Sequence, residues 1–500
     1  MVKEQVLSKT RFMAGLQCPL RLWLSVNEKN TPEFDVDEVS QARMESGNRV
    51  GEIARNYFPG GILIEGERYE YEKKCVLTQD ALKNGHSIIY EAAFMHEGTF
   101  VAIDILERGS IGWIIREVKS TTSVKTEHVL DAAIQLMTAR SAGLDVVRAD
   151  LLHLNRECRY PDLTNLFASE DVTAGAEEMI ADLRARESEL KCVMTEDAPE
   201  VEVGAHCDSP RACAFKSRCW PEIPEHHIST LYRFGQAKTQ ALIEQGVHTI
   251  DQVDGSTKLN ATAARQVDSI ISGRVIVEAG LGPALDSLTF PAAFLDFETV
   301  SMAIPVWDGC SPYTQVPVQF SCHFMDSGGA LQHHEWLAVA GCDPRPQLAK
   351  ALVKACEGAE TVVAYNAGFE KGCVIGLAQV CPELEDQLMA IADKLADLLP
   401  MVRNNVYHPQ FHGSFSIKSV LPALIPGMGY TALDIASGDL AALKLEKMIL
   451  GEIEGNTDEL RSALLKYCEM DTLAMVELYR ELQSLAGKEG GLTKLWTTPS

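Results

Sequence analysis

Residues 294–299 read Phe-Leu-Asp-Phe-Glu-Thr, a short apolar run that carries two carboxylates. Ala292 and Ala293 precede it, and an apolar run of this length predicts a buried β-strand. Side chains two positions apart on a strand point to the same face of the sheet. Asp296 and Glu298 are therefore expected to lie side by side, as carboxylate ligands for a divalent cation do.

Two later segments add carboxylates of the same kind. The predicted strand 360–365 ends at Asn366, and Glu370 follows at the start of a helix. Tyr467 and Asp471 are four residues apart, so they share one face of a helix. Four carboxylates can hold two metal ions about 4 Å apart, an arrangement that activates water and stabilises the leaving oxygen of a phosphodiester. The predicted catalytic residues are Asp296, Glu298, Glu370, Tyr467 and Asp471, with Asp296, Glu298 and Asp471 as metal ligands and Tyr467 orienting the attacking water.

A second acidic set lies in the N-terminal part of the chain. Asp104 falls in the predicted strand 99–107, and Glu117 lies just before Lys119 at the end of the strand 112–118. Glu117 and Lys119 share a face by the strand period, and a hairpin would bring Asp104 beside them. The two carboxylates can bind Mg²⁺, and the lysine can orient water or stabilise developing charge. The alternative is a solvent-facing acidic and basic pattern on an amphipathic hairpin.

Three of the fourteen cysteines, Cys207, Cys213 and Cys219, recur at six-residue intervals among proline, aromatic and basic residues. Such groups are typical of iron–sulfur and zinc sites, which take four ligands. Cys18 is the remote candidate for the fourth position. We therefore predict a metal group on these four cysteines; zinc completed by Cys18 or His206, or cysteines without a metal, are the alternatives.

The composition fits a globular protein of two or three domains, with 500 residues, 46% hydrophobic and 23% charged. No apolar run approaches the roughly 18–20 residues of a membrane span, and the start of the chain lacks a signal-like apolar stretch. A cytoplasmic location without membrane contact is expected. The net charge of −25 means that nucleic acid binding would need locally basic surfaces, such as Arg211, Lys216 and Arg218.

The predicted elements give an α/β fold class in three parts. Helices are predicted at 36–58, 126–142 and 174–191, and strands at 61–65, 86–95, 99–107, 112–118, 146–154, 292–296, 317–325 and 360–365. The acidic, proline-containing stretch 196–200 suggests a boundary. The predicted domains are 1–225, a nuclease-like domain with the cysteine group; 226–284, a helical connector; and 285–490, a second nuclease-like domain.

The N-terminal motifs resemble those of RecB-like PD-(D/E)XK nucleases, in particular the CRISPR-associated branch with an iron–sulfur cluster. The motifs are Ser8–Phe12, Gly15–Pro19, the set Asp104, Glu117 and Lys119, and Gln135. The resemblance implies a restriction-endonuclease-like fold, catalytic roles for these four residues, and a 4Fe–4S cluster on Cys18, Cys207, Cys213 and Cys219. Two positions depart from the pattern: Gly51 stands where the branch often has a metal-binding histidine, and Ala139 where a tyrosine usually follows the glutamine.

The C-terminal motifs are similar to those of DEDDy 3′–5′ exonucleases of the ribonuclease H-like fold, except that Glu370 replaces an aspartate. Within roughly residues 290–425 the chain also resembles a bacterial domain of unknown function, number 2779. Ser414, Ser416 and Lys418 are expected to contact phosphate near a helix N-terminus, together with Asn366. A helix-capping role for the serines is the alternative.

These patterns together predict an Mg²⁺- or Mn²⁺-dependent exonuclease that hydrolyses phosphodiester bonds, with two active sites. DNA is favoured over RNA by the N-terminal resemblance, and partners such as a helicase or repair and defence proteins are expected. The alternative function is a nucleic-acid-binding scaffold in which one or both sites are degenerate.

Overall fold

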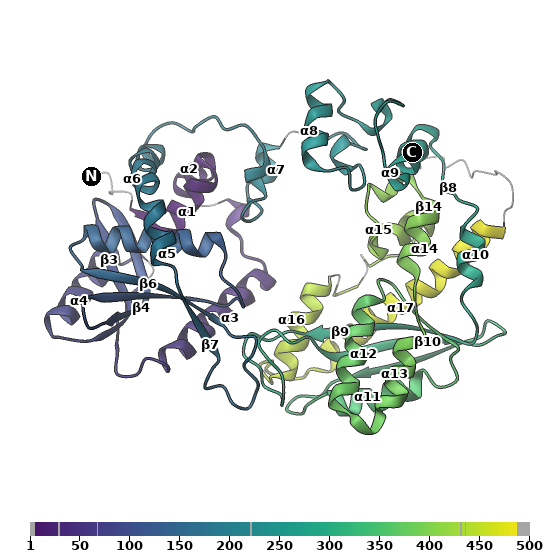
Figure 1. Cartoon of the computed structure of the whole chain (residues 1–500). Helices are drawn as coiled ribbons and strands as arrows, with labels where there is room; N and C mark the ends of the chain where they lie inside the picture. Colours follow the sequence, from purple (N-terminus) through teal and green to yellow (C-terminus); the bar gives the residue numbers. More distant parts are fainter. Residues whose placement is uncertain are drawn as a thin grey trace. The chain divides into compact units, whose positions relative to one another are not determined.

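The computed structural model describes residues 6–28, 31–67, 69–220, 223–430, 433–435 and 437–487 (Figure 1). The chain divides into two compact units: Met1–Pro221 with Met302–Thr314, and Glu222–Ser301 with Gln315–Ser500. Each unit contains a mixed sheet covered by helices, which confirms the α/β class. None of the described helices is both long enough and apolar enough to cross a membrane.

The first unit is built on a seven-stranded sheet in the order β2-β3-β4-β5-β6-β7, with β1 paired to β4. The strands are β1 (Leu7–Ser8), β2 (Ile62–Leu63), β3 (Ile88–His96), β4 (Thr99–Arg108), β5 (Trp113–Lys119), β6 (Val146–Leu154) and β7 (Phe167–Asp171). Strands β3, β4 and β5 are antiparallel neighbours, whereas β5 and β6 are parallel. A parallel pair needs a crossover, and a buried helix between the two strands provides it.

That crossover helix is α5, which is buried along most of its length. The helices of this unit are α1 (Lys9–Gln17), α2 (Pro19–Asn27), α3 (Glu38–Arg55), α4 (Tyr71–Lys83), α5 (Thr126–Ser141), α6 (Thr173–Thr195) and α7 (Lys216–Cys219). Helix α5 shares its apolar core with α1, α2 and α6, while Val50 and Ala54 of α3 pack in separate clusters across the sheet (Figure 1). The predicted helices and strands of this region are confirmed; α4, α7, β1 and β7 were not predicted.

The segment Met302–Thr314 follows strand β9 (Ala292–Val300) and packs within the first unit. Tyr160 exchanges two backbone hydrogen bonds with it, donating to the carbonyl of Cys310 at 3.0 Å and accepting from Gly309 at 2.9 Å. Ala303 is buried in the cluster that also contains Val50. The loop that follows the Asp296–Glu298 strand is therefore part of the first unit's core.

The second unit has a five-stranded sheet in the order β11-β10-β9-β12-β13. The remaining strands are β10 (Val316–Met325), β11 (Leu331–Leu337), β12 (Thr361–Ala364) and β13 (Leu395–Asp397). Strands β9, β10 and β11 form an antiparallel meander, and β12 and β13 continue the sheet parallel to β9. Asp296 lies directly opposite Ser321 of β10. The predicted strands of this region are confirmed, and β11 and β13 extend the sheet.

Helices cover both faces of this sheet. Leu295 and Phe297 of β9 face an apolar core made with α11 (Arg345–Ala355), α12 (Gly368–Val380) and α13 (Glu385–Asp393). The opposite face packs against α17 (Asp458–Gly487), and α16 (Gly438–Ile449) contacts β9 and α17. Since side chains alternate along a strand, Asp296 and Glu298 lie on the α17 face.

The remaining helical elements belong to the second unit. They are α8 (Gln236–Glu244), α9 (Ala261–Ser272), α10 (Leu281–Asp286), α14 (Leu398–Asn405) and α15 (Ile417–Leu424), with the strand pair β8 (Ile276–Val277) and β14 (Val406–Tyr407). The segment predicted as a connector forms its own small apolar cluster, which includes Ile228, Ile250 and Val267. It is anchored by Arg265, which donates to the carbonyls of Arg403 and Asn404.

Candidate active sites

The carboxylates of the second unit converge as the sequence predicted. Oxygen atoms of Asp296, Glu298 and Asp471 lie within 4.8 Å of one another. Glu370, in the first turn of α12, is 3% exposed and near enough for its charge to raise the pKa of Asp296. One carboxylate oxygen of Glu370 is buried and accepts no hydrogen bond among the described residues. We call these four residues the acidic cluster.

Burial raises the pKa of every member of the acidic cluster, and repulsion by neighbouring members adds to it for Asp296 and Glu298. The pKa of Asp296 lies well above its usual range, mainly because the side chain is buried and secondly because of the charge of Asp471. Burial and Asp471 raise the pKa of Glu298 to about 8. Burial raises the pKa of Glu370 to about 7 and that of Asp471 to about 6. A buried group of acids that resists ionisation in this way favours a bound cation.

Two tyrosines and a lysine border the acidic cluster. Tyr430 donates a hydrogen bond to Asp471 Oδ1 at 2.6 Å, and Lys418 Nζ donates to the Tyr467 hydroxyl at 3.1 Å. The Lys418 ammonium also lies 5.0 Å and 5.3 Å from the ring centres of Tyr430 and Tyr467. Burial raises the pKa of both phenols above the usual value, so both remain neutral donors. Tyr430 was not predicted, because no spacing rule links it to the acids.

The predicted phosphate contacts lie at the start of α15. The hydroxyls of Ser414, Ser416 and Ser419 are joined by hydrogen bonds of 3.0–3.3 Å. Ser416 occupies the N-cap position, but its side chain makes no capping hydrogen bond, which weakens the capping alternative. Asn366 has a left-handed backbone with a φ of 72°, and its backbone N–H donates to Asp397 Oδ1 at 2.9 Å.

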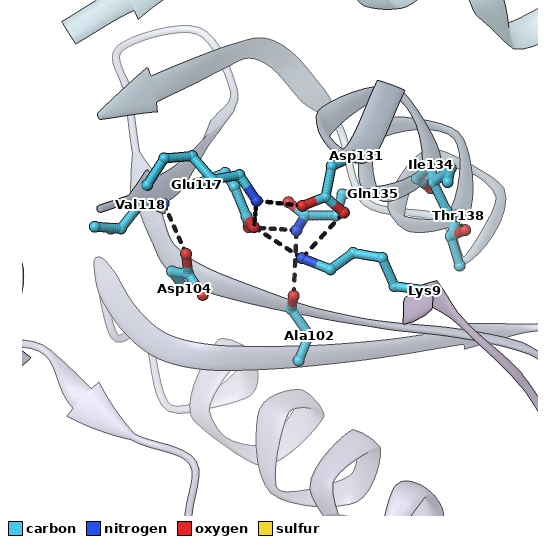
Figure 2. A network of polar contacts seen from close by, with 10 residues as sticks. Lys9, Ala102, Asp104, Glu117, Val118, Asp131, Ile134, Gln135 and Thr138 are labelled. Atoms are coloured by element: carbon cyan, nitrogen blue, oxygen red, sulfur yellow. Dashed lines mark hydrogen bonds and ion pairs between the residues drawn. The ribbon is translucent and has the colours of Figure 1, made fainter. Parts of the chain in front are cut away.

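The first unit also brings its predicted residues together, but in a different electrostatic state (Figure 2). Glu117 Oε1 accepts from Lys9 Nζ at 2.8 Å and from Lys119 Nζ at 2.7 Å. Gln135 donates to the other oxygen of Glu117 at 2.5 Å. Asp104 accepts a hydrogen bond from the backbone N–H of Val118 at 2.7 Å.

Two members of this network, Lys9 and Asp131, were not predicted to take part. Asp131 lies one turn before Gln135 on α5 and pairs with Lys119 and, at 3.3 Å, with Lys9. The i, i+4 spacing from Gln135 was the available signal for Asp131. Lys9 comes from α1, 108 residues before Glu117, and only its place in the Ser8–Phe12 motif pointed to it.

The pKa values of Glu117 and Asp104 are shifted in opposite directions. Burial would raise the pKa of Glu117, but the charges of Lys119 and Lys9 outweigh it and hold the pKa well below the usual range. Burial, followed by the charge of Glu117, raises the pKa of Asp104 well above its usual range. Glu117 is thus a carboxylate that is already neutralised by cations of the protein.

Gly51 stands where the resemblance expects a histidine, and open space surrounds it. A Cβ atom built on Gly51 meets no other atom within 4 Å. One turn away on α3, Gly47 approaches Ser120, and Arg55 pairs with Glu91, whose charge acts on Asp104. By helical spacing Gly51 therefore lies on the same face.

The four predicted cysteine ligands lie close together. Burial raises the pKa of Cys219, and the charges of three nearby cysteines raise it further: Cys213, Cys18 and Cys207. Gln17, adjacent to Cys18, donates hydrogen bonds of 2.7 Å to the carbonyls of His206 and Arg211. The end of α1 is thereby tied to the cysteine segment, although about 190 residues separate them in sequence.

Comparisons with known proteins agree with one of the stated resemblances. Residues 293–416 match the model of the "Domain of unknown function (DUF2779)" family, which confirms the expected likeness of this part of the chain. The chain is 26% identical over 216 residues to "Uncharacterized protein MG366" of Mycoplasma genitalium, covering 39% of this chain and 32% of that protein. The homologue from Mycoplasma pneumoniae is 27% identical over 210 residues, with 37% and 31% covered. The aligned part of the chain thus spans about a third of the length of these relatives.

Proposed function

We propose that this protein is an Mg²⁺- or Mn²⁺-dependent nuclease whose main active site is the acidic cluster of the second unit. The observation that carries this proposal is the convergence of Asp296, Glu298 and Asp471 within 4.8 Å, with buried Glu370 beside them. Buried acids at this density repel one another unless cations are bound. Oxygen ligands of this kind suit Mg²⁺ and Mn²⁺.

The residues in and around the acidic cluster would have different roles in phosphodiester hydrolysis. The four carboxylates would hold one or two divalent cations, which supply an activated water and stabilise the leaving oxygen when bound. Tyr467 offers a neutral hydroxyl held by Lys418, suited to orienting a water molecule. The Lys418 charge and the serine hydroxyls at the start of α15 are suited to holding a phosphate of the substrate.

The strand arrangement of the second unit supports the proposed exonuclease likeness. An antiparallel meander followed by two strands parallel to its first strand, in the order β11-β10-β9-β12-β13, is the order expected for a ribonuclease H-like fold. The predicted ligands also occupy the expected elements: the first strand, the helix after the fourth strand, and the C-terminal helix. A 3′–5′ exonuclease on DNA, with RNA as the second substrate, is therefore proposed.

The first unit supplies a second candidate nuclease site of the PD-(D/E)XK type. Its hairpin β4–β5, the crossover α5 and the parallel strand β6 fit that fold, and Asp104, Glu117 and Lys119 are its proposed catalytic residues. Glu117, however, is already paired with two lysines. This pairing favours, as a second candidate function for this unit, a nucleic-acid-binding role with weak or no cleavage.

We also propose a 4Fe–4S cluster on Cys18, Cys207, Cys213 and Cys219. The donor set fits, because four thiols whose charges interact are the usual ligands of such a cluster. Among the described residues, no three of these sulfur atoms lie within 4.8 Å of one another. A single zinc ion with Zn–S bonds of about 2.3 Å would draw the sulfurs closer than that, so zinc is the less favoured occupant.

A cleavage assay tests the proposed function. Purified protein would be incubated with Mn²⁺ and with 5′-labelled single-stranded DNA, double-stranded DNA or RNA, so that 3′-end trimming appears as a ladder. Wild type should trim DNA, Asp296→Asn should not, and Lys119→Ala should retain trimming. Trimming at wild-type rates by Asp296→Asn would overturn the assignment. The absence of any cleavage on all substrates would favour the binding scaffold.

A further inference from the structure

A second group of metal-ligating side chains lies beside the acidic cluster and has no part in the proposed chemistry. His323 of β10 and His333 of β11 are directly opposite each other in the antiparallel register. Their rings are stacked, with centroids 4.6 Å apart and planes at 26°. Glu469 of α17 closes the group from above the sheet, and ligand atoms of the three residues all lie within 4.8 Å of one another.

Each histidine has one ring nitrogen held by a hydroxyl group. His323 Nδ1 lies 2.8 Å from Thr472 Oγ1, and His333 Nε2 lies 2.9 Å from Ser321 Oγ. The two hydroxyls are themselves 2.7 Å apart, and Thr472 also donates to the Glu469 carbonyl. Metal-binding histidines are usually oriented in this way, with one nitrogen fixed by an outer hydrogen bond and the other directed to the ion.

The second nitrogen of the His333 ring faces the carboxylate of Glu469. His333 Nδ1 lies 3.8 Å from Glu469 Oε1, too long for a hydrogen bond and close to the separation of two ligands on one ion. Two imidazoles and one carboxylate form a ligand set used for zinc with a fourth position open. The set differs from the all-oxygen acidic cluster, which suits Mg²⁺ and Mn²⁺.

We propose that His323, His333 and Glu469 form a separate binding site for a transition-metal ion of the zinc class. Ser321 and Thr472 connect this site to the acidic cluster: Ser321 lies opposite Asp296, and Thr472 follows Asp471. An ion held here would fix the position of α17 on the sheet, and with it the position of Asp471. The site stands on its own ligands and does not depend on the nuclease proposal.

Co²⁺ serves as the probe, because its visible spectrum reports coordination geometry and a near-ultraviolet charge-transfer band reports thiolate ligands. Metal-free full-length protein carrying Asp296→Asn would be titrated with Co²⁺, then with Zn²⁺ to displace it. The Asp296→Asn background weakens cobalt binding by the acidic cluster, because a main carboxylate is removed. The near-ultraviolet band distinguishes cobalt bound to the cysteines from cobalt bound to nitrogen and oxygen ligands. We expect one Co²⁺ per chain with a nitrogen–oxygen spectrum lacking that band, displaced by Zn²⁺.

Three variants in the same background identify the ligands. His333→Gln and Glu469→Gln should each lower the Co²⁺ affinity at least about tenfold. His334→Gln, a matched change on the opposite face of the same strand, should leave the affinity unchanged. Glu469 is partly exposed on α17, so Glu469→Gln should fold and its Co²⁺ affinity can be measured even if His333→Gln fails to fold. Unchanged affinity in Glu469→Gln, or cobalt bound with thiolate absorption only, would overturn the proposal.

Discussion

The two acidic sites of this protein differ in how their carboxylate charges are balanced. In the first unit, Lys9 and Lys119 neutralise Glu117, so the carboxylate is stable without a metal ion. In the second unit, Asp296, Glu298 and Asp471 lie together, and burial raises all three pKa values, with mutual repulsion adding to the rise for Asp296 and Glu298. Similar sequence signals can therefore produce either an ion network paired within the protein or a cluster of buried carboxylates with raised pKa values.

The largest expected effect is the loss of cleavage when a ligand of the acidic cluster is removed. Asp296→Asn keeps the shape of the side chain but removes one charged ligand from the centre of the cluster. We expect Mn²⁺-dependent 3′-end trimming to fall at least about a hundredfold, because losing a direct ligand costs more than the 10–100-fold typical of supporting residues. Glu335→Gln, an exposed position on β11, is the matched control and should trim DNA normally.

The comparison can be sharpened by supplying the first site with a ligand that it lacks. Gly51→His places an imidazole in open space on the face of α3 that carries Gly47 and Arg55. In an Asp296→Asn background we expect any residual Mn²⁺-dependent DNA cleavage to rise by about tenfold, since an Mn²⁺ ion held with the help of the added imidazole would compete with the lysines for Glu117. Gly51→Ala controls for the change in helix propensity; an equal rise in that variant would show that metal binding is not the cause.

The acidic cluster should bind Mn²⁺ more tightly as the pH rises. The raised pKa values of about 8 for Glu298, 7 for Glu370 and 6 for Asp471 mean that these groups hold protons in the metal-free protein. Bound Mn²⁺ must displace those protons, so its affinity should increase between about pH 6 and pH 9. Calorimetric titration at several pH values measures this change, and a flat profile would argue that the carboxylates are ionised before metal arrives.

A smaller effect is expected on the stability of the metal-free protein. The pKa of Glu298 is raised in the folded state, so the folded protein binds the extra proton and loses stability as pH rises through the interval from about 4.5 to about 8. Glu298→Gln does not titrate and should be more stable than wild type at about pH 8, by about 1–3 kcal/mol. Urea unfolding in the presence of a chelator measures this difference in the free energy of unfolding. We expect Glu298→Gln and wild type to have equal urea midpoints at about pH 5, and Glu298→Gln to have the higher midpoint at about pH 8.

Much of this architecture followed from local sequence patterns. Strand periodicity placed Asp296 with Glu298 and Glu117 with Lys119, and helical spacing placed Tyr467 with Asp471, because each pair lies on a single element. The groups that were missed join distant segments. Lys9, Tyr430 and the pair His323 and His333 reach their sites only through tertiary packing and strand register, which no local period encodes.

Direct measurement of Mn²⁺ binding tests the contrast between the two sites most sharply. Calorimetric titrations would compare wild type with Asp296→Asn and with Glu117→Gln, each in the absence of nucleic acid. We predict that Asp296→Asn abolishes the tightest Mn²⁺ binding, whereas Glu117→Gln leaves it unchanged. Tight binding that survives in Asp296→Asn and disappears in Glu117→Gln would contradict the account, because the metal would then belong to the site that the lysines already neutralise.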